Sequence, residues 1–489
     1  MEPKTDTTAL EFGPCLKEIL KEKRVSASEL ARMMSYKSRN SIFRILGGEG
    51  SHGARQAFCT RLMQEDPLAL DGEQRRRLEE ALEISRIGLR DYLGNQAMRD
   101  LLTGSSPVPA CAAVRIDAAE YCPQDPDFHK VLEEVKSAQR VHLTILGCCD
   151  RAIFDALYGW IGRMDGKVKV THMIYTGSEE IIRNIAAIQP LLYCSFYDAH
   201  CMQPGTFSRE REHVYRCNWI HAHVQDRQGD WYERQMILID QGVFVPTRRT
   251  ATAENSTIQA FFERDLMRMP PLKTVFSVRR SIRDYLTFAK DCRRLEQGRA
   301  VYMIKLDVPV CFVHPDIVAA CVAEGFADKA AMDELARIHR QRFENYFTKK
   351  KVSRVIFSRE AMECFARTGR QSDHFFALRS YTPEERVRIL RNLREQEENN
   401  PCFHVHFFTD GFQPPAGEVS LYEGIGTLMA KPYTDYNLAG EHAETIITQA
   451  EFCARYKAFY LNDLLVRHVM DRAGTLAALD ELIDMAQNA

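Results

Sequence analysis

The chain has 489 residues, of which 45% are hydrophobic and 27% are charged, and its formal net charge is -2. This length exceeds one ordinary core and predicts two or three domains, while the composition excludes a disordered chain. The near-neutral charge excludes a uniformly basic nucleic-acid-binding protein, so any nucleic acid must contact a local basic patch.

The chain lacks the patterns that are typical of export or membrane insertion. Its start, MEPKTDTTALEFG, does not have the basic and then apolar segments of a signal peptide. No run approaches the roughly 18 apolar residues of a membrane span. Fifteen cysteines at irregular spacing are typical of reduced thiols and not of a disulfide framework. We therefore expect a cytoplasmic protein without a membrane partner.

Residues 1–102 are expected to form an all-α domain. Ser26 and Glu29 have the spacing of a capping box ahead of an apolar run, which predicts a helix start at this point. Further helices are expected over about 55–63, after Asp71, and again up to the end of the domain.

The stretch from Val25 to Leu46 predicts two short helices joined by a polar turn, a helix-turn-helix over about 26–46. On a helical wheel of the second helix, four apolar residues share one side: Ile42, Phe43, Ile45 and Leu46. The opposite side carries Asn40, Ser41 and Arg44. A recognition helix needs this division, because one face packs on its own domain while the other reaches base edges.

The polar side of this helix offers groups that read DNA. Arg44 matches guanine O6 and N7, and Asn40 matches adenine N6 and N7, each for about 1–3 kcal/mol of base discrimination. Ser38 is the expected N-cap, and the free N–H groups beyond it suit a phosphate. Four flanking residues also suit phosphates: Lys37, Arg39, His52 and Arg55.

The local charge agrees with a one-sided DNA contact. From residue 37 to residue 61 there are five basic residues (37, 39, 44, 55 and 61) against the single acid Glu49, a local net charge of +4. Residues 65–83 are acidic, with seven acids and three arginines. Nucleic-acid-binding domains typically concentrate their basic groups on one face in this way.

The segment SELARMM, the turn after it and NSIFRILGGEG resemble the Cro/phage-repressor (XRE-type) helix-turn-helix family over about 80 residues. In that family an alanine packs where Ala31 stands, and a branched apolar residue packs where Ile42 stands. The resemblance implies an operator-binding domain. It departs from the family at Ser35, where glycine is usual, and in an Ala31–Ile42 spacing that is one residue longer. We therefore expect a different turn.

After residue 102 the helical periods end, and the sequence pattern changes to a linker followed by alternating strand-like and helix-like segments. Residues 103–127, which include TGSSPVPACAAV, are the predicted linker because small residues, Gly and Pro break every period. From 128 to 489, strand-like and helix-like segments alternate, which predicts a large mixed α/β region. It divides into two expected halves, 128–265 and 300–430, followed by C-terminal helices over 442–487. The expected fold is multidomain, with an all-α helix-turn-helix domain followed by this region.

Two strand-to-helix connections are the candidate site for a small-molecule effector. RVHLTILGC (140–148) and KVKVTHMIY (167–175) read as neighbouring strands, and α/β sheets open their ligand crevice at the carboxyl ends of such strands. The residues at these ends are Cys148, Cys149, Asp150, Arg151, Thr176, Gly177 and Ser178. Apolar packing of the cysteines and helix capping by Asp150 and Arg151 are the structural alternatives.

One group of residues has the composition of a metal site: His200, Cys201, Cys217, His221 and His223. His221 and His223 would point to one face of a strand, a spacing that can chelate zinc. The group has neither a CxxC pair nor a third ligand at tight spacing. Hydrogen-bonded structural histidines are the favoured interpretation, and no cofactor is expected.

Enzyme motifs are absent from the large region. It has no GxxxxGK[ST], GxSxG or HExxH motif, and EGIGTLM (423–429) carries only part of a glycine-rich phosphate loop. We therefore expect no catalytic residue. The basic segment 268–299 is either a second nucleic-acid contact or the solvated face of a packed helix, and its apolar stripe favours the packed helix.

The leading hypothesis is a bacterial transcriptional regulator. Its helical domain binds a double-stranded DNA operator, and its α/β region senses an effector, oligomerises, or does both. A homodimer is expected, because one short recognition helix makes few base contacts and a two-fold dimer reads two half-sites. Two alternatives stay open: an intracellular enzyme of unknown reaction with a helical targeting domain, and a protein-interaction module.

Overall fold

The structure is a computed structural model that describes residues 11–36, 39–49, 51–103, 126–147, 151–161, 167–175, 181–202, 205, 207, 218–239, 242–244, 249–250, 262, 264–277, 282–321, 328–371, 379–413, 415–430 and 444–489. Contacts divide the chain into a helical unit that runs to Ala97 and a mixed unit that starts at Met98. Most of the predicted linker lies outside the described residues. Within the described residues, no helix combines the length and the apolar character needed to cross a membrane.

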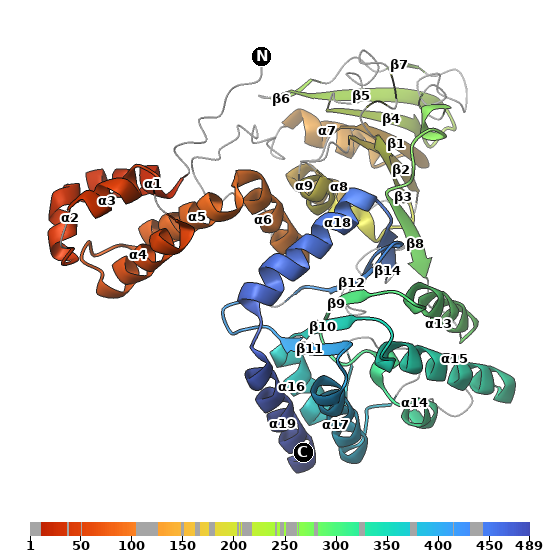
Figure 1. Cartoon of the computed structure of the whole chain (residues 1–489). Helices are drawn as coiled ribbons and strands as arrows, with labels where there is room; N and C mark the ends of the chain where they lie inside the picture. The colour runs from red at the N-terminus through yellow and green to blue at the C-terminus, as the bar shows by residue number, and fades with distance from the viewer. Residues whose placement is uncertain are drawn as a thin grey trace. The chain divides into compact units, whose positions relative to one another are not determined.

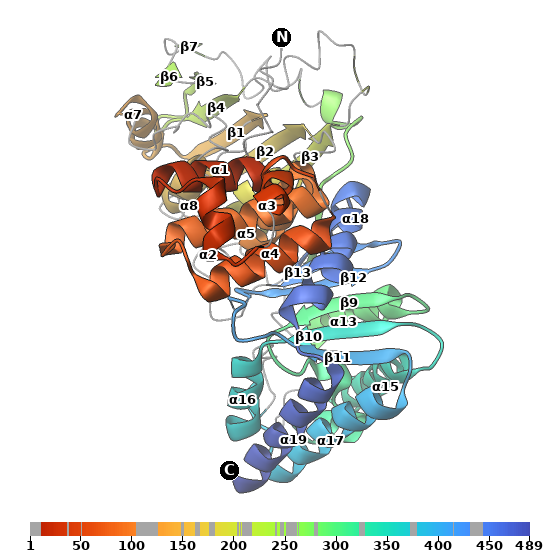
Figure 2. The same cartoon turned by 60° about the vertical axis from the view of Figure 1, so that its left-hand side comes forward.

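The first unit is built from helices, the red-to-orange segments of Figures 1 and 2. They are α1 (Phe12–Glu22), α2 (Ala27–Met33), α3 (Arg39–Leu46), α4 (His52–Glu65), α5 (Gly72–Ile87) and α6 (Leu89–Thr103). The last of these begins in the first unit and ends in the second. The predicted capping box of Ser26 and Glu29 is confirmed, and Asp71 forms another with Gln74 at the start of α5.

One apolar core holds α1 to α5 together. Its fully buried side chains come from every one of these helices: Phe12, Leu16, Ile19, Leu30, Ile42, Leu62 and Leu78. Phe12 and Phe58 meet edge to face at 6.2 Å between ring centroids, which joins α1 to α4. The expectation that Phe43 packs inward is wrong, since this side chain is 51% exposed. It lies about 100° from Ile42 around the helix, at the edge of the apolar stripe.

The second unit contains two sheets with a repeated arrangement. In the first sheet the strands are β1 (Arg140–Leu146), β2 (Val168–Tyr175), β3 (Tyr197–Met202), β4 (Trp219–Gln225), β5 (Trp231–Ile239), β6 (Gly242–Phe244) and β7 (Arg249–Thr250). Their order is β3-β2-β1-β4-β5-β6, with β7 paired to β5. β1, β2 and β3 are parallel, whereas β4 is antiparallel to β1. The accompanying helices are α7 (Pro126–Val135), α8 (Arg151–Ile161), α9 (Ile181–Ala187) and α10 (Gln189–Leu192).

The second sheet comprises β8 (Lys273–Ser277), β9 (Val301–Lys305), β10 (Ser353–Phe357), β11 (Phe403–Phe407), β12 (Glu418–Tyr422), β13 (Gly426–Ala430) and β14 (Glu444–Ile447). Its order is β11-β10-β9-β12-β13-β14-β8. Again a central strand, here β9, has parallel strands on one side and an antiparallel strand on the other. The chain therefore forms the same mixed sheet twice.

Helices cover both faces of the second sheet. They are α13 (Ile282–Glu296), the 3₁₀ turn η3 (Val310–Phe312), α14 (Pro315–Cys321), α15 (Lys329–Phe347), α16 (Arg359–Thr368), α17 (Pro383–Asn399), α18 (Ala450–Phe459), the π-helix η5 (Tyr460–His468) and α19 (Arg472–Asn488). α14, α16, α17 and α19 share one large apolar core with alternate residues of β9, β10 and β11. α18 contacts β12 and β13. The described residues thus form a mixed α/β unit.

The predicted C-terminal helices over 442–487 need one correction. Residues 444–447 form β14, which pairs with β13 and β8, and the helix begins only at Ala450. Thr445, Ile446 and Ile447 are β-branched, which favours a strand, and the neighbouring strands supply the backbone partners that it needs.

Candidate nucleic-acid interface

The turn after α2 has a defined geometry that centres on Ser35. Ser35 has a φ of +53°, in the left-handed region that glycine adopts most readily. The Tyr36 N–H donates to the Ala31 carbonyl at 2.9 Å, and the Ser35 N–H donates to the Arg32 carbonyl at 3.0 Å. These two bonds close the helix in a Schellman motif. The backbone at Ser35 therefore has a conformation that glycine adopts more readily than serine.

Tyr36 fixes the turn to α4. Its ring lies 6.1 Å from the Phe58 ring, and the Arg61 guanidinium covers it at 5.4 Å from the ring centroid. Arg61 also pairs with Glu65 at 2.6 Å. Arg61 is one of the five basic residues counted over residues 37–61. Its side chain contacts Tyr36 and Glu65 and so links the turn to α4.

α3 is held against α2 and the start of α1 by its inward face. Ile42, Ile45 and Leu46 are buried there. Gly13 allows the close approach of α1, since a Cβ at this position would lie 2.6 Å from the Leu46 carbonyl oxygen. A carbonyl oxygen cannot move aside as a flexible side chain can, so this contact fixes the position of the last turn of α3.

The opposite side of α3 is open. We define its outer face as Arg39, Asn40, Ser41, Phe43 and Arg44, all of which are exposed. Arg44 contacts Glu49 at 3.4 Å, with both side chains about two-thirds exposed. Exposed pairs of this kind contribute little to stability. The Arg44 guanidinium can therefore exchange Glu49 for another acceptor at small cost.

The predicted DNA-binding residues fall into three groups. Arg39, Asn40, Ser41 and Arg44 lie together on the outer face of α3. His52 and Arg55 are half-buried in the first turns of α4, whose N-cap is Ser51. Lys37 and Ser38 lie outside the described residues. Sequence reasoning missed the exposure of Phe43 and of Met33, which is 48% exposed, because both fit an apolar helical period.

The arginines of α5 differ from those of α3. Arg75 pairs with Asp66 at 2.6 Å, Arg76 with Glu73 at 2.6 Å and Arg77 with Glu22 at 2.7 Å. Asp66 and Glu73 of the predicted acidic segment thus pair with two of its arginines, whereas the partner of the third, Arg77, lies on α1. The uneven charge of the first unit therefore has two causes. One is the distribution of basic and acidic residues, and the other is that the arginines of α5 are paired with acids of the same unit.

The residues of the predicted effector site follow β1 and β2 in the chain. β1 and β2 are adjacent and parallel, with Leu146 opposite Met173, so their carboxyl ends share one edge of the first sheet. Cys148, Cys149, Asp150, Thr176, Gly177 and Ser178 lie outside the described residues. Arg151 is described, and its guanidinium contacts Asp155 at 3.0 Å and Gln189 at 3.1 Å. These contacts give Arg151 a structural role between α8 and α10.

The described candidates for metal ligands fall on two strands that are not neighbours. His200 and Cys201 lie on β3, and β2 and β1 stand between β3 and β4. Neighbouring strands are about 4.8 Å apart, so β3 and β4 are about 14 Å apart. Cys217 lies outside the described residues, among which no three candidate ligands converge.

His221 and His223 do lie side by side on β4, as the alternating pattern indicated. Burial lowers the pKa of His221 to about 4, against the opposing effect of Glu233, whose carboxylate lies 3.7 Å away. The ring of His221 is therefore neutral at pH 7. Both histidines are buried side chains of β4 in the first sheet.

Comparisons with known proteins place the chain in no family. No protein-family model matches it, and no curated protein matches it significantly. A solved structure with some likeness is polyphosphate kinase from Porphyromonas gingivalis, at 12% identity and a TM-score of 0.18. The match covers 72% of this chain and only 53% of that enzyme. A TM-score this low supports no argument about fold or function.

Proposed function

We propose that α3 is the recognition helix of a sequence-specific DNA-binding domain, and that the chain is a transcriptional regulator. One observation carries the proposal: α3 buries Ile42, Ile45 and Leu46 while its outer face stays open. A helix that enters the major groove needs this division, together with a turn that fixes its direction. The Schellman turn at Ser35 supports that second requirement.

Four side chains of the outer face have a chemical role in this proposal. Arg44 donates two hydrogen bonds to guanine O6 and N7, and Asn40 pairs with adenine N6 and N7. Phe43 offers an apolar surface to a thymine methyl group. Arg39, at the start of the helix, contacts a phosphate and sets the register without reading sequence.

The second unit would supply oligomerisation or effector sensing. One eight-residue helix contacts few base pairs, so we propose a homodimer that reads two half-sites about 34 Å apart. A closed two-fold dimer predicts an operator with matching two-fold symmetry.

The direct experiment is selection of duplexes from a random-sequence pool by the full-length protein, followed by fluorescence anisotropy on the enriched sequence. We expect a two-fold-symmetric motif and an affinity that falls steeply with salt, because phosphate contacts release counterions. The combined substitution Asn40→Ala and Arg44→Ala should abolish the preference for the motif.

Arg283→Gln is the matched control, because Arg283 is an exposed arginine on α13 of the second unit. It should leave both affinity and preference unchanged. Enrichment of no motif, or a motif preference that survives the combined substitution, would contradict the proposal. Binding that does not respond to salt would instead favour a protein-interaction module.

A further inference from the structure

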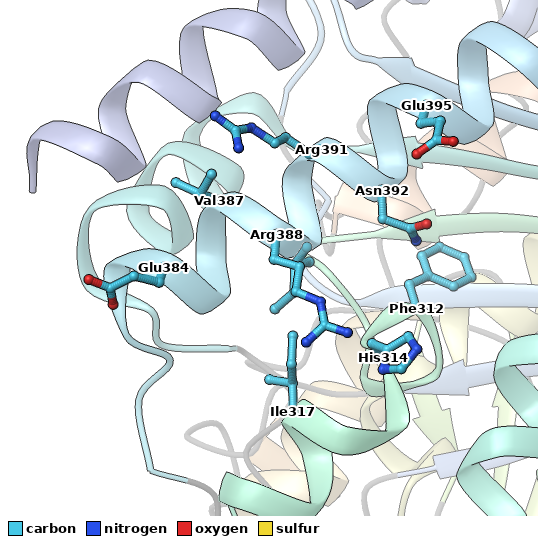
Figure 3. A pocket seen from close by; sticks show the side chains of 10 residues that line it. Phe312, His314, Ile317, Glu384, Val387, Arg388, Arg391, Asn392 and Glu395 are labelled. Atoms are coloured by element: carbon cyan, nitrogen blue, oxygen red, sulfur yellow. The ribbon is translucent and has the colours of Figure 1, made fainter.

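A cavity of about 360 Å³ opens beside the second sheet, between α17 and the segment that follows β9 (Figure 3). Its volume lies within the range of about 300–1,000 Å³ that is usual for small-molecule sites. Four of its ten lining residues are apolar and six are polar or charged, among them Phe312, His314, Ile317, Val387, Arg388 and Asn392.

The apolar part of the cavity is preformed. Phe312, Ile317 and Val387 are buried, and all three belong to the main core of the second sheet. Phe312 packs edge to face with Tyr346 at 5.0 Å and with Phe403 at 5.3 Å. A ring held from several sides keeps its position when a ligand binds, which lowers the entropy cost of binding.

Asn392 presents a hydrogen-bond donor that lacks an acceptor. Its Nδ2 atom is buried, and no residue in the described part of the chain accepts from it. A buried amide left without a partner is costly, so such groups are found where a ligand or water completes them. Figure 3 shows Asn392 beside Phe312, within the wall of the cavity.

Arg388 lies one turn before Asn392 on α17, so the two side chains share a helix face. Arg388 Nη1 donates to Asp316 at 2.7 Å, and His314 bonds the other carboxylate oxygen of Asp316. Burial opposes ionisation of Asp316, but these two hydrogen bonds outweigh it and lower its pKa. The anchored guanidinium keeps further N–H groups for another acceptor.

We propose that this cavity binds a small organic monocarboxylate with an apolar body. The carboxylate accepts from Asn392 Nδ2 and from Arg388, and the body packs on Phe312, Ile317 and Val387. An amine would leave the Asn392 donor unpaired and would be repelled by Arg388. Arg391 also lines the cavity, as do Glu384 and Glu395. The two acids disfavour a second negative charge, so we expect phosphates and dicarboxylates to bind more weakly than a monocarboxylate. The site does not depend on whether α3 binds DNA.

The test measures binding of defined probes to the full-length protein by saturation-transfer NMR and by thermal shift. The carboxylates are butyrate, hexanoate and phenylacetate, and the matched non-acids are phenylacetamide and phenethylamine. We expect affinity to rise with the size of the apolar body, and phenylacetate to bind at least tenfold more tightly than either non-acid. Absence of binding by all three carboxylates, or equal binding of phenylacetate and phenylacetamide, would overturn the proposal.

Two substitutions locate the site. Arg388→Gln removes the charge from an exposed side chain, and Asn392→Asp replaces the buried donor with an acceptor of nearly the same shape. Each substitution should lower the affinity for phenylacetate at least tenfold, while Arg283→Gln should leave this affinity unchanged. Unchanged affinity in Arg388→Gln would overturn the proposal even if Asn392→Asp fails to fold. Since no readout involves DNA, failure here is distinguishable from failure of the DNA-binding proposal.

Discussion

α3 of the first unit and α13 of the second are both short amphipathic helices rich in basic residues, yet their charged faces differ. Three of the four basic side chains of α13 have partners in the same unit: Lys290 with Glu334 at 2.8 Å, Arg293 with Gln341 at 2.5 Å and Arg294 with Asp291 at 3.1 Å. On α3, Arg44 pairs with the loop residue Glu49 at 3.4 Å, and both side chains are about two-thirds exposed.

The apolar faces of the two helices are equivalent. α13 buries Tyr285, Leu286 and Ala289 against α15, as α3 buries Ile42 and Ile45 in the first unit. Composition and periodicity therefore do not separate a packed basic helix from a recognition helix. The separating feature is where the partners lie: Lys290 and Arg293 of α13 contact the neighbouring helix α15, whereas Arg44 of α3 pairs with an exposed loop acid.

The strongest test of this difference concerns Glu296 on α13. Its buried carboxylate accepts from Arg342 at 2.7 Å and from Tyr346 at 3.0 Å. Glu296→Ala leaves the Arg342 charge buried without a partner and should cost about 3–5 kcal/mol. Asp291→Asn, in an exposed pair on the same helix, should cost less than about 1 kcal/mol. Urea unfolding of the full-length variants measures both, and equal losses would contradict a structural role for the inner charges of α13.

The position of α3 depends on Gly13. Gly13→Ala places a Cβ 2.6 Å from the Leu46 carbonyl oxygen, so either α1 or α3 must shift. We expect a cost of about 1–3 kcal/mol in thermal unfolding of the first unit, as for other overpacked sites. Gly72→Ala, at a helical glycine with no atom near the added Cβ, is the control and should not destabilise. Similar melting of both variants would show that α3 does not need this contact.

A substitution at Ser35 should stabilise the turn before α3. Ser35→Gly relieves the positive φ and should stabilise the first unit by about 0.5–1 kcal/mol. Ser41→Gly, within α3, should destabilise it by about 0.5 kcal/mol, because glycine weakens a helix interior. Thermal melts compare the two, and a lower melting temperature for Ser35→Gly would contradict the turn geometry.

Glu49 is the acid that pairs with Arg44 on the outer face of α3, and we expect its neutralisation to have the smallest effect among these substitutions. Glu49→Gln frees Arg44 and removes a charge that repels phosphate, so affinity for the selected duplex should rise by up to about fivefold. Glu79→Gln, an exposed acid on α5, should change it little. Equal gains in the two variants would point to net charge and not to release of Arg44.

Local signals in the sequence predicted much of the fold. The capping box at Ser26 lies within four consecutive residues, and the apolar runs of β1, β2, β9 and β10 are each confined to a single short segment. Such signals can be recognised without knowing the tertiary contacts. β3, with the sequence YDAHCM, escaped prediction because its pairing with β2 and not its composition makes it a strand.

The site was predictable in part for the same reason. Asn40, Ser41 and Arg44 follow from the helical period, and they lie on the exposed side of α3. The contacts of Arg61 with Tyr36 and the exposure of Phe43 depend on how α3 and α4 meet, which local sequence does not encode. The cavity beside α17 joins segments about 75 residues apart, and no motif marks it.

The central claim is that Arg44 reads a base. The most direct measurement is a double-mutant cycle on the selected duplex, which combines Arg44→Ala with replacement of each guanine in the half-site. We expect one guanine to couple to Arg44 by about 1–3 kcal/mol, so that replacing this guanine barely changes the affinity of the Arg44→Ala variant. Additive losses at every guanine would show that Arg44 contacts only the DNA backbone and does not read a base.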